Sequence, residues 1–257
     1  MEIGDLYGLG AHRLLCGDAL DDDNIKYLMH GEKAEMVFID PPFFAIGNSI
    51  GTGNKSGSAE TTMVKPFFRQ IGRICADNLK PSHGAYICCD WRTYPAAFDG
   101  LAQEMKVCQC VVWDYTYMKM GVYLRSSHEF IIYVTNNRPN PNAYGIKKGE
   151  KLNPILMRTD LGNIWHIKDN IANSSKKLHP SQKPVEVAKT ALTSYKDKVP
   201  DIVLDFFAGS GTVLIACEEL GISCRCIEKD LEHCKTIIDR YERQTGKRAE
   251  KIGNIYE

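Results

Sequence analysis

Short apolar runs alternate along this chain with longer segments of helical periodicity. The runs, rich in β-branched and aromatic residues, predict strands, whereas apolar residues that recur every three to four positions predict amphipathic helices. Alternation of the two predicts an α/β fold, a mostly parallel sheet with helices on both faces, in a single domain over residues 1–257. The expected strands are 14–18, 36–40, 85–91, 109–115, 129–135, 201–207 and 222–227, and the expected helices are 21–30, 64–79, 94–105, 184–196, 212–220 and 231–245.

Two segments interrupt this alternation. Residues 44–62 are rich in Gly, Ser, Thr and Asn and lack periodicity, which predicts a flexible loop. Residues 136–180 contain four prolines and several Asn and Gly residues. Long stretches without periodicity inside a compact domain are usually functional or flexible, so we expect an insert here, over 136–178.

Composition excludes several classes of protein. The chain has 257 residues and a net charge of zero, its start does not resemble a signal peptide, and no apolar run is as long as a membrane span. Ten cysteines occur without a Cys-x-x-Cys pair, so we expect no metal site. Six of them lie in strand-like segments and are expected to be small buried hydrophobes in a reducing, cytoplasmic compartment: Cys88, Cys89, Cys108, Cys110, Cys224 and Cys226.

The charge is unevenly distributed. Residues 1–40 hold nine acids against three bases, and residues 136–183 hold nine bases against three acids. A neutral protein with one basic insert can carry a phosphate-binding face, although a solvated basic loop is the open alternative.

The first candidate for chemistry is the end of the strand at 36–40. Pro41 and Pro42 cannot continue a sheet ladder, because each lacks a backbone N–H. The chain must therefore leave the sheet at Asp40 and present Phe43 just beyond it. Ligands of open α/β sheets bind at the carboxyl ends of the strands, so this acid, turn and ring are candidate site residues.

The second candidate is a strand, glycine turn and helix at 205–212. Its glycines allow a ligand to approach the backbone, and Glu228, after the next strand, is placed to accept hydrogen bonds from ribose hydroxyls. A dinucleotide site needs a third glycine, where this chain has Leu214. The spacing favours a nucleoside cofactor without a diphosphate, such as S-adenosylmethionine, over NAD.

Together these two stretches resemble a family. Asp40-Pro41-Pro42-Phe43 is similar to the catalytic motif of DNA amino-methyltransferases, and residues 207–211 (Phe-Ala-Gly-Ser-Gly) resemble their S-adenosylmethionine motif. The order, catalytic motif first, is that of the beta class. Further similar segments are 15–18 (Leu-Cys-Gly-Asp), 125–129 (Arg-Ser-Ser-His-Glu), 179–184 (His-Pro-Ser-Gln-Lys-Pro), and the start at 4–7 with 12–15, which resembles phage-type and ParB-associated adenine methylases.

The resemblance implies a Rossmann-like S-adenosylmethionine-dependent methyltransferase fold and a site-specific DNA adenine methyltransferase. In it, Asp40 and the carbonyl of Pro41 would hold the exocyclic amine of a flipped-out adenine, with Pro42 in the turn and Phe43 stacked on the base. Cofactor contacts would come from Asp18, Ser181, Gln182, Lys183, Asp205, Phe207, Gly209, Ser210, Gly211, Thr212 and Glu228. The insert occupies the place of a target-recognition segment on double-stranded DNA. Candidate DNA contacts are Arg125, which precedes the insert, and Lys147, Lys148, Arg158, Lys176 and Lys177 within it.

Several alternatives stay open. Methylation of the exocyclic amine of cytosine is one, although that branch usually has Ser at the position of Asp40. The others are a nucleotide-dependent oxidoreductase, a catalytically silent DNA-binding module, and an RNA or protein substrate. Methylation of cytosine carbon 5 is excluded, because it needs a cysteine that typically follows proline, and no Pro-Cys pair occurs. A homodimer, a restriction endonuclease partner and a bacterial or phage origin are further expectations from the resemblance.

Overall fold

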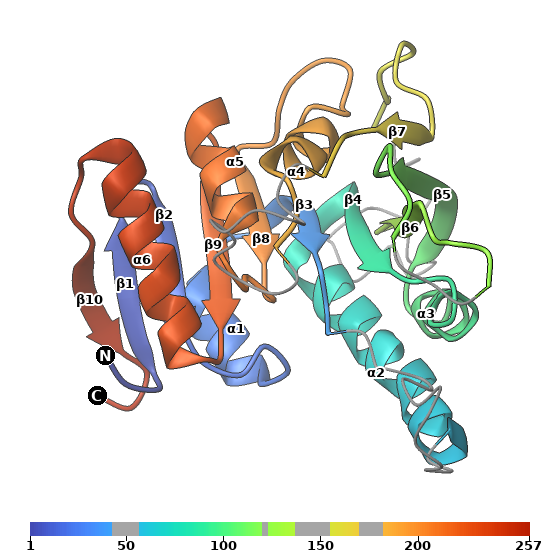
Figure 1. The fold of residues 1–257 in the computed structure, drawn as a ribbon. Coiled ribbons are helices and arrows are strands. Elements are labelled where there is room, and N and C mark those ends of the chain that lie inside the picture. The colour runs from blue at the N-terminus through green and yellow to red at the C-terminus, as the bar shows by residue number, and fades with distance from the viewer. Residues whose placement is uncertain (43–56, 120–122, 137–154, 170–181) are drawn as a thin grey trace, which may run out of the picture.

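The computed structural model describes residues 1–42, 57–119, 123–136, 155–169 and 182–257. Within these ranges the strands form one sheet in the order β10-β1-β2-β9-β8-β3-β4-β6-β5-β7. In Figure 1 the order runs from β10 at the left to β5 at the right, with β7 drawn above β5 and β6. The strands are β1 (Asp5–Leu9), β2 (His12–Cys16), β3 (Ala34–Ile39), β4 (Leu79–Cys89), β5 (Lys106–Asp114), β6 (His128–Thr135), β7 (Ile164–His166), β8 (Ile202–Asp205), β9 (Ser223–Glu228) and β10 (Glu250–Asn254).

The centre of the sheet is parallel, as predicted. Neighbours from β2 through β9, β8 and β3 to β4 all run in the same direction. Strand β3 is buried along its whole length, which suits a parallel strand covered on both faces. Antiparallel pairs lie toward the sides of the sheet, where β1 joins β2 and β10, and β6 joins β4 and β5.

Helices cover both faces, which confirms the predicted layers. Helices α1 (Asp22–Met29), α2 (Gly57–Asn78) and α3 (Tyr94–Leu101) pack on one face of the sheet. Helices α4 (Val185–Leu192), α5 (Thr212–Leu220) and α6 (Leu231–Thr245) pack on the other. Two hydrophobic cores result, one on each side, and the described helices include none long and apolar enough to cross a membrane.

Local sequence signals account for several helix ends. The side chain of Asp21 caps α1 by accepting from the Asp23 amide, and Asp230 caps α6 in the same way. Helix α5 ends at Gly221, which adopts a left-handed conformation at the C-cap. Other boundaries differ from the prediction: α2 begins at Gly57, inside the expected loop 44–62, and the rest of that loop lies in 43–56, outside the described residues.

The structure changes two expectations, that residues 136–178 form a separate insert and that six cysteines are buried. Within the predicted insert, strand β7 pairs in parallel with β5 and so belongs to the main sheet. Among the described strands, β7 covers only the carboxyl end of β5, so the start of β5 is an edge of this part of the sheet. Cys108 is therefore exposed and Cys110 half-buried, contrary to the prediction, whereas the other four predicted cysteines are buried.

The direction of chain progression reverses between two central strands. From β3 the chain moves on to β4, whereas from β8 it moves the opposite way to β9. The crevice beside such a switch point is where open α/β sheets bind ligands. Three acids follow or end adjacent parallel strands at this edge: Asp40 after β3, Asp205 at the end of β8, and Glu228 at the end of β9.

Candidate functional site

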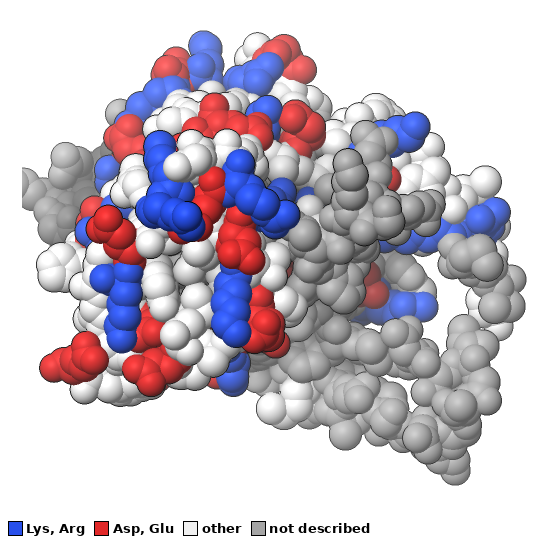
Figure 2. All heavy atoms as spheres, turned by 60° about the vertical axis from the view of Figure 1, so that its left-hand side comes forward, with Lys and Arg blue, Asp and Glu red and all other residues white. Residues whose placement is uncertain are grey.

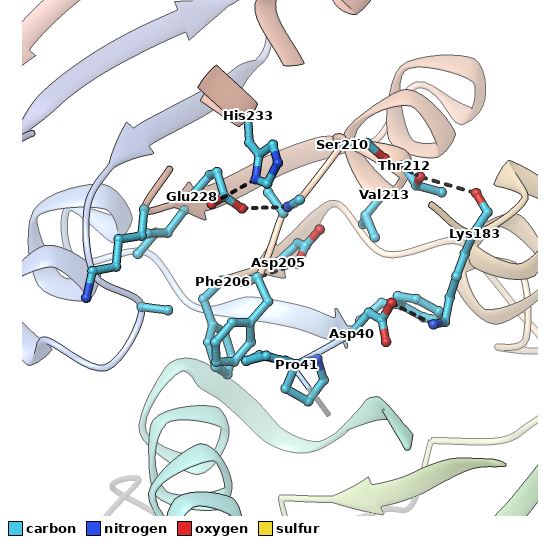
Figure 3. A pocket seen from close by; sticks show the side chains of 18 of the residues that line it. Asp40, Pro41, Lys183, Asp205, Phe206, Ser210, Thr212, Val213, Glu228 and His233 are labelled. Atoms are coloured by element: carbon cyan, nitrogen blue, oxygen red, sulfur yellow. Dashed lines mark hydrogen bonds and ion pairs between the residues drawn. The ribbon is translucent and has the colours of Figure 1, made fainter. Parts of the chain in front are cut away.

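A cavity of about 360 Å³ opens at the switch point. This volume lies in the range of sites for small ligands and cofactors. Figure 3 shows the three strand-end acids around it, with Asp40 and Glu228 at opposite ends and Asp205 between them. The cavity brings together these residues predicted from the sequence: Asp18, Asp40, Pro41, Pro42, Gln182, Lys183, Asp205, Phe207, Gly209, Ser210, Thr212 and Glu228.

Glu228 is held rigidly at one end of the cavity. One carboxylate oxygen, Oε2, accepts from the amide of Gly209 at 2.7 Å, and the other, Oε1, accepts from the amide of Asp230 at 2.8 Å. Each carboxylate oxygen has a second lone pair. The carboxylate is thus fixed in place with acceptor capacity left for a ligand, as a ribose-binding role requires.

The glycine turn has two glycines with different tasks. Gly209 (φ +53°) lines the cavity, and among the described residues, its chain neighbours apart, no atom lies within 4 Å of where a Cβ would be, so a ligand can approach its backbone. Gly211 (φ +74°) faces away from the cavity, because a Cβ there would meet Ile237 of α6 at 3.1 Å. We therefore assign Gly211 a role in helix packing, and the cofactor contact expected of it from the sequence stays a prediction.

Asp205 and Asp18 occupy contrasting environments. Asp205 is 2% exposed, and its Oδ1 accepts from the amide of Phe207 at 3.1 Å, which fixes the start of the glycine turn. Burial raises the pKa of Asp205 well above its usual value. Asp18 lies at the rim, where it pairs with the exposed Lys229 at 2.7 Å.

The opposite end of the cavity holds Asp40 beside a buried lysine. Lys183 Nζ lies 2.6 Å from Asp40 Oδ2 and 3.1 Å from Glu129 Oε2. Burial raises the pKa of Asp40, and the positive charge of Lys183 opposes that rise. Burial would also raise the pKa of Glu129, but Lys183 and Lys119 outweigh it and lower the value to about 2.

Sequence reasoning missed the contribution of Glu129. Glu129 lies in the segment 125–129, which resembles a family motif, but the sequence indicates no role for it. Glu129 lies near the start of β6, an antiparallel strand, so its beginning meets the carboxyl ends of the parallel strands. Apolar patterning predicts that residues 129–135 form a strand but not the direction in which it runs. The sequence therefore could not indicate that Glu129 lies at the carboxyl edge of the sheet. Glu129 does not line the cavity itself but contacts Lys183, which does. The cavity-lining residues that were not predicted are Ala19, Phe38, Ala188, Phe206, Ala208, Val213, Ile227, Lys229 and His233.

The predicted DNA contacts are only partly described. Arg125 is exposed, and its guanidinium donates to the carbonyls of Met118 and Lys119. Arg158 forms an ion pair with Asp160. The predicted residues Phe43, Lys147, Lys148, Lys176, Lys177 and Ser181 lie outside the described residues. In the described part of the chain, no group of three or more His, Cys, Asp or Glu side chains is placed to hold a metal ion.

Comparison with known proteins decides the family. A sequence model described as DNA methylase, covering N6- and N4-directed enzymes, matches residues 34–239. The chain belongs to this DNA methylase family. The predicted enzyme class, a DNA methyltransferase with S-adenosylmethionine as methyl donor, is thereby confirmed, and the oxidoreductase alternative is wrong.

Relatives of this DNA methylase span most of its length. The Type II methyltransferase M2.DpnII of Streptococcus pneumoniae is 27% identical over 243 residues, which cover 86% of this chain and 87% of that one. The structure of the M1.HpyAVI–SAM complex has a TM-score of 0.57 at 20% identity, covering 88% of this chain and 98% of that one. PvuII DNA methyltransferase, described as cytosine-N4-specific, has a TM-score of 0.61 at 14% identity, covering 94% and 96%. These structures share the predicted fold.

The cavity of this DNA methylase fits S-adenosylmethionine. The test is the donor set: a fixed carboxylate at Glu228 for the ribose, an open backbone at Gly209, and a volume near 360 Å³ for a nucleoside joined to an amino acid. A pyrophosphate would instead need the third glycine of a dinucleotide turn. Glu228, Gly209 and Asp18 would hold the adenosine end, which leaves the Asp40 end for the methyl-accepting base.

Proposed function

We propose that this DNA methylase is site-specific and methylates the exocyclic amine of adenine, held by Asp40 and Pro41. One observation carries the proposal: Asp40 and Pro41 line the same cavity as Gly209 and Glu228, although about 170 residues of sequence separate the two pairs. An amine acceptor and a cofactor-binding turn therefore share one cavity. Proximity of the two reactants in such a cavity contributes much of the rate.

The residues at the Asp40 end would act as hydrogen-bond acceptors. The exocyclic amine of adenine is a poor nucleophile because its lone pair is delocalised into the ring. Hydrogen bonds donated by its two N–H groups to the Asp40 carboxylate and the Pro41 carbonyl would localise that lone pair on nitrogen. When bound, S-adenosylmethionine supplies an electrophilic methyl group on a sulfonium for this nitrogen. Asp40 then stabilises the positive charge that develops on the amine.

The adenine must leave the duplex to reach the cavity, at a cost of a few kcal/mol. We propose that DNA approaches the carboxyl edge of the sheet, where strand β7 of the insert 136–178 ends beside Asp114 of β5. The face that carries α6 and β10 suits DNA less, because Figure 2 shows Lys and Arg mixed there with Asp and Glu. Lys247 and Arg248, between α6 and β10, form ion pairs with Glu218 and Glu242, which neutralise charges on this face.

The proposal extends to the cellular setting. Relatives such as M2.DpnII are named Type II methyltransferases, which supports a restriction endonuclease partner that cuts the unmethylated site. Protection of the cell's own DNA would place this protein in the cytoplasm of a bacterium or of a phage-infected cell. Dimerisation, expected from the resemblance to the beta class, belongs to the same proposal.

The deciding experiment is single-molecule sequencing of DNA from a methylation-free host that expresses the protein. We expect N6-methyladenine in one sequence context, and none with Asp40→Ala. Purified Asp40→Ala should bind S-adenosylhomocysteine within a few-fold of wild type, because Asp40 lies at the opposite end of the cavity from Glu228. Absence of any modified base with wild type, across varied duplexes in vitro as well, would support the silent DNA-binding module instead.

A second candidate is methylation of the exocyclic amine of cytosine. It is favoured by one observation: the cytosine-N4-specific PvuII enzyme shares this fold, with a TM-score of 0.61. Asp40 argues for adenine, since the cytosine branch usually has serine there. The same sequencing experiment separates the two, because it reports the identity of the modified base.

A further inference from the structure

Lys183 is buried in a way that lysines rarely are. Its side chain is 8% exposed, and its ammonium lies between two carboxylates, 2.6 Å from Asp40 Oδ2 and 3.1 Å from Glu129 Oε2. A buried ammonium is costly unless it is paired. Its surroundings therefore direct it toward Asp40, as the dashed line in Figure 3 shows. The cofactor contact expected of Lys183 from the sequence stays a prediction.

Glu129 is in turn held by two other donors. Its Oε1 accepts from the hydroxyl of Tyr115 at 2.9 Å and from Lys119 Nζ at 3.1 Å. The Lys119 ammonium also lies 4.0 Å from the centre of the Tyr115 ring. Two carboxylates and two ammonium groups thus form one cluster without net charge. Lys183 consequently brings no uncompensated positive charge to a cavity that would receive a sulfonium.

Lys183 also connects the two ends of the cavity through its backbone. Its carbonyl accepts from Thr212 Oγ1 at 3.3 Å, and Thr212 is the first residue of α5, directly after the glycine turn. The residue that holds Asp40 is therefore bonded to the segment that binds the cofactor.

We propose that Lys183, held in place by Glu129, is a positioning residue that keeps the Asp40 carboxylate ionised and oriented. This inference rests on the proposed role of Asp40 as acceptor of the amine. Lys183 occupies Oδ2 of Asp40, and among the described residues no donor reaches Oδ1. The geometry leaves that one oxygen for an N–H group of the base.

The physical reason is that Asp40 must be ionised to accept from the amine in a site that disfavours ionisation. Burial raises the pKa of Asp40, and Glu129 raises it further by like-charge repulsion. Lys183 opposes both, because it is the cation in direct contact. The charged or titratable groups that face Asp40 from the packed elements are Lys183, Glu129 and Lys119, with Asp205 on β8 and Cys88 on β4.

Two substitutions predict shifts of opposite sign. Lys183→Met removes the opposing cation and should raise the pH at which Asp40 titrates by at least about one pH unit. Glu129→Gln removes a like charge and should lower that pH. Lys183→Arg keeps a cation and should stay closer to wild type than Lys183→Met does. Lys235→Met serves as a matched control, because Lys235 is an exposed lysine on α6 that pairs only locally, with Glu232.

The titration is read in two ways. Carbon-13 NMR of protein labelled at the aspartate side-chain carboxyl follows Asp40 directly, and Asp40→Asn identifies its signal by removing it. The pH profile of kcat reports the same group during turnover. At neutral pH and saturating cofactor, Lys183→Met should lose at least about tenfold in kcat. Its affinity for S-adenosylhomocysteine should stay within about threefold of wild type.

Different failures have different signatures. An Asp40 titration unmoved in Lys183→Met, or a kcat unchanged while cofactor affinity falls, would overturn the positioning role. If Lys183→Met does not fold, the sign in Glu129→Gln decides, and an unchanged or raised titration pH would count against the inference. If wild type transfers no methyl group, the proposed function fails, whereas the NMR titration still decides whether Lys183 governs Asp40.

Discussion

Replacement of Glu228 by alanine tests the cofactor end of the cavity most directly. The Glu228 side chain is 13% exposed, and its carboxylate is oriented by the amides of Gly209 and Asp230 at 2.7 and 2.8 Å. We expect the substitution to weaken cofactor binding while Asp40 and its partners stay in place. The effect should therefore appear in affinity before it appears in the chemical step.

The magnitude follows from the hydrogen bonds that would be lost. A hydrogen bond from a neutral donor to a charged acceptor contributes about 1.5–3 kcal/mol. Loss of one such bond to a ribose hydroxyl corresponds to a decrease in affinity of about ten- to 150-fold. Water can enter the space left by the side chain and hydrate the second hydroxyl. We therefore take the loss of one bond as the expected effect, and not twice that value.

Isothermal titration calorimetry with S-adenosylhomocysteine and its 2′-deoxy analogue provides the assay. Wild type should prefer the hydroxylated ligand, and Glu228→Ala should bind both ligands equally weakly. This comparison separates loss of a ribose contact from a general disturbance of the turn, which would weaken both ligands and leave the preference intact. Glu232→Ala is the matched control, because Glu232 is an acid of the same type whose side chain is 79% exposed.

Two results would refute the assignment of Glu228 to the ribose. One is an affinity for S-adenosylhomocysteine in Glu228→Ala within about twofold of wild type. The other is a preference for the hydroxylated ligand that survives the substitution, since the discriminating group would then lie elsewhere in the cavity. A loss of the cooperative unfolding transition would instead assign Glu228 a structural role through the amides that it accepts from.

Further predictions concern the glycine turn and acid stability. Gly211→Ala should destabilise the fold by about 2–5 kcal/mol in urea unfolding, from about 1–2 kcal/mol for left-handed backbone and about 1–3 kcal/mol for overpacking against Ile237. Gly209→Ala, with open space around it, should cost less stability but more cofactor affinity, and the reverse order would contradict the division of tasks. Burial would raise the pKa of Glu35, but Lys80 and its other partners lower it to about 2, so its stabilisation is lost as pH falls from about 4.5 toward 2. In Glu35→Gln the free energy of unfolding should therefore fall less steeply below about pH 4.5. An unchanged slope would exclude the pairing of Glu35 with Lys80 as its cause.

Most of the central fold could be predicted because its elements carry strong local signals. Strands such as β3 and β9 are short apolar runs, and helix α6 has both a capping aspartate and a terminal glycine. The strands that were missed, β1, β7 and β10, are short or polar and form at the sides of the sheet. Their hydrogen-bond partners are distant in sequence, so local patterning carries little information about them.

The candidate site divides in the same way. The sequence alone determined which residues can perform chemistry: an acid stopped by two prolines at Asp40, a glycine turn at 207–211, and a strand-end acid at Glu228. Those assignments depend on local backbone constraints, and the residues that impose them all lie within a short motif. Family membership adds that the chain is a DNA methylase, and the order of the motifs connects the catalytic stretch with the glycine turn.

Only the tertiary structure decided how these residues act on one another. It directed Lys183 toward Asp40 and Glu129, and Gly211 toward Ile237, although the motifs favoured cofactor contacts for both Lys183 and Gly211. The physical reason is that ion pairing and steric contact depend on distances of a few ångströms between segments far apart in the chain. A motif specifies a backbone turn and a residue type, whereas the side chain's partner is set by the packing of the whole sheet.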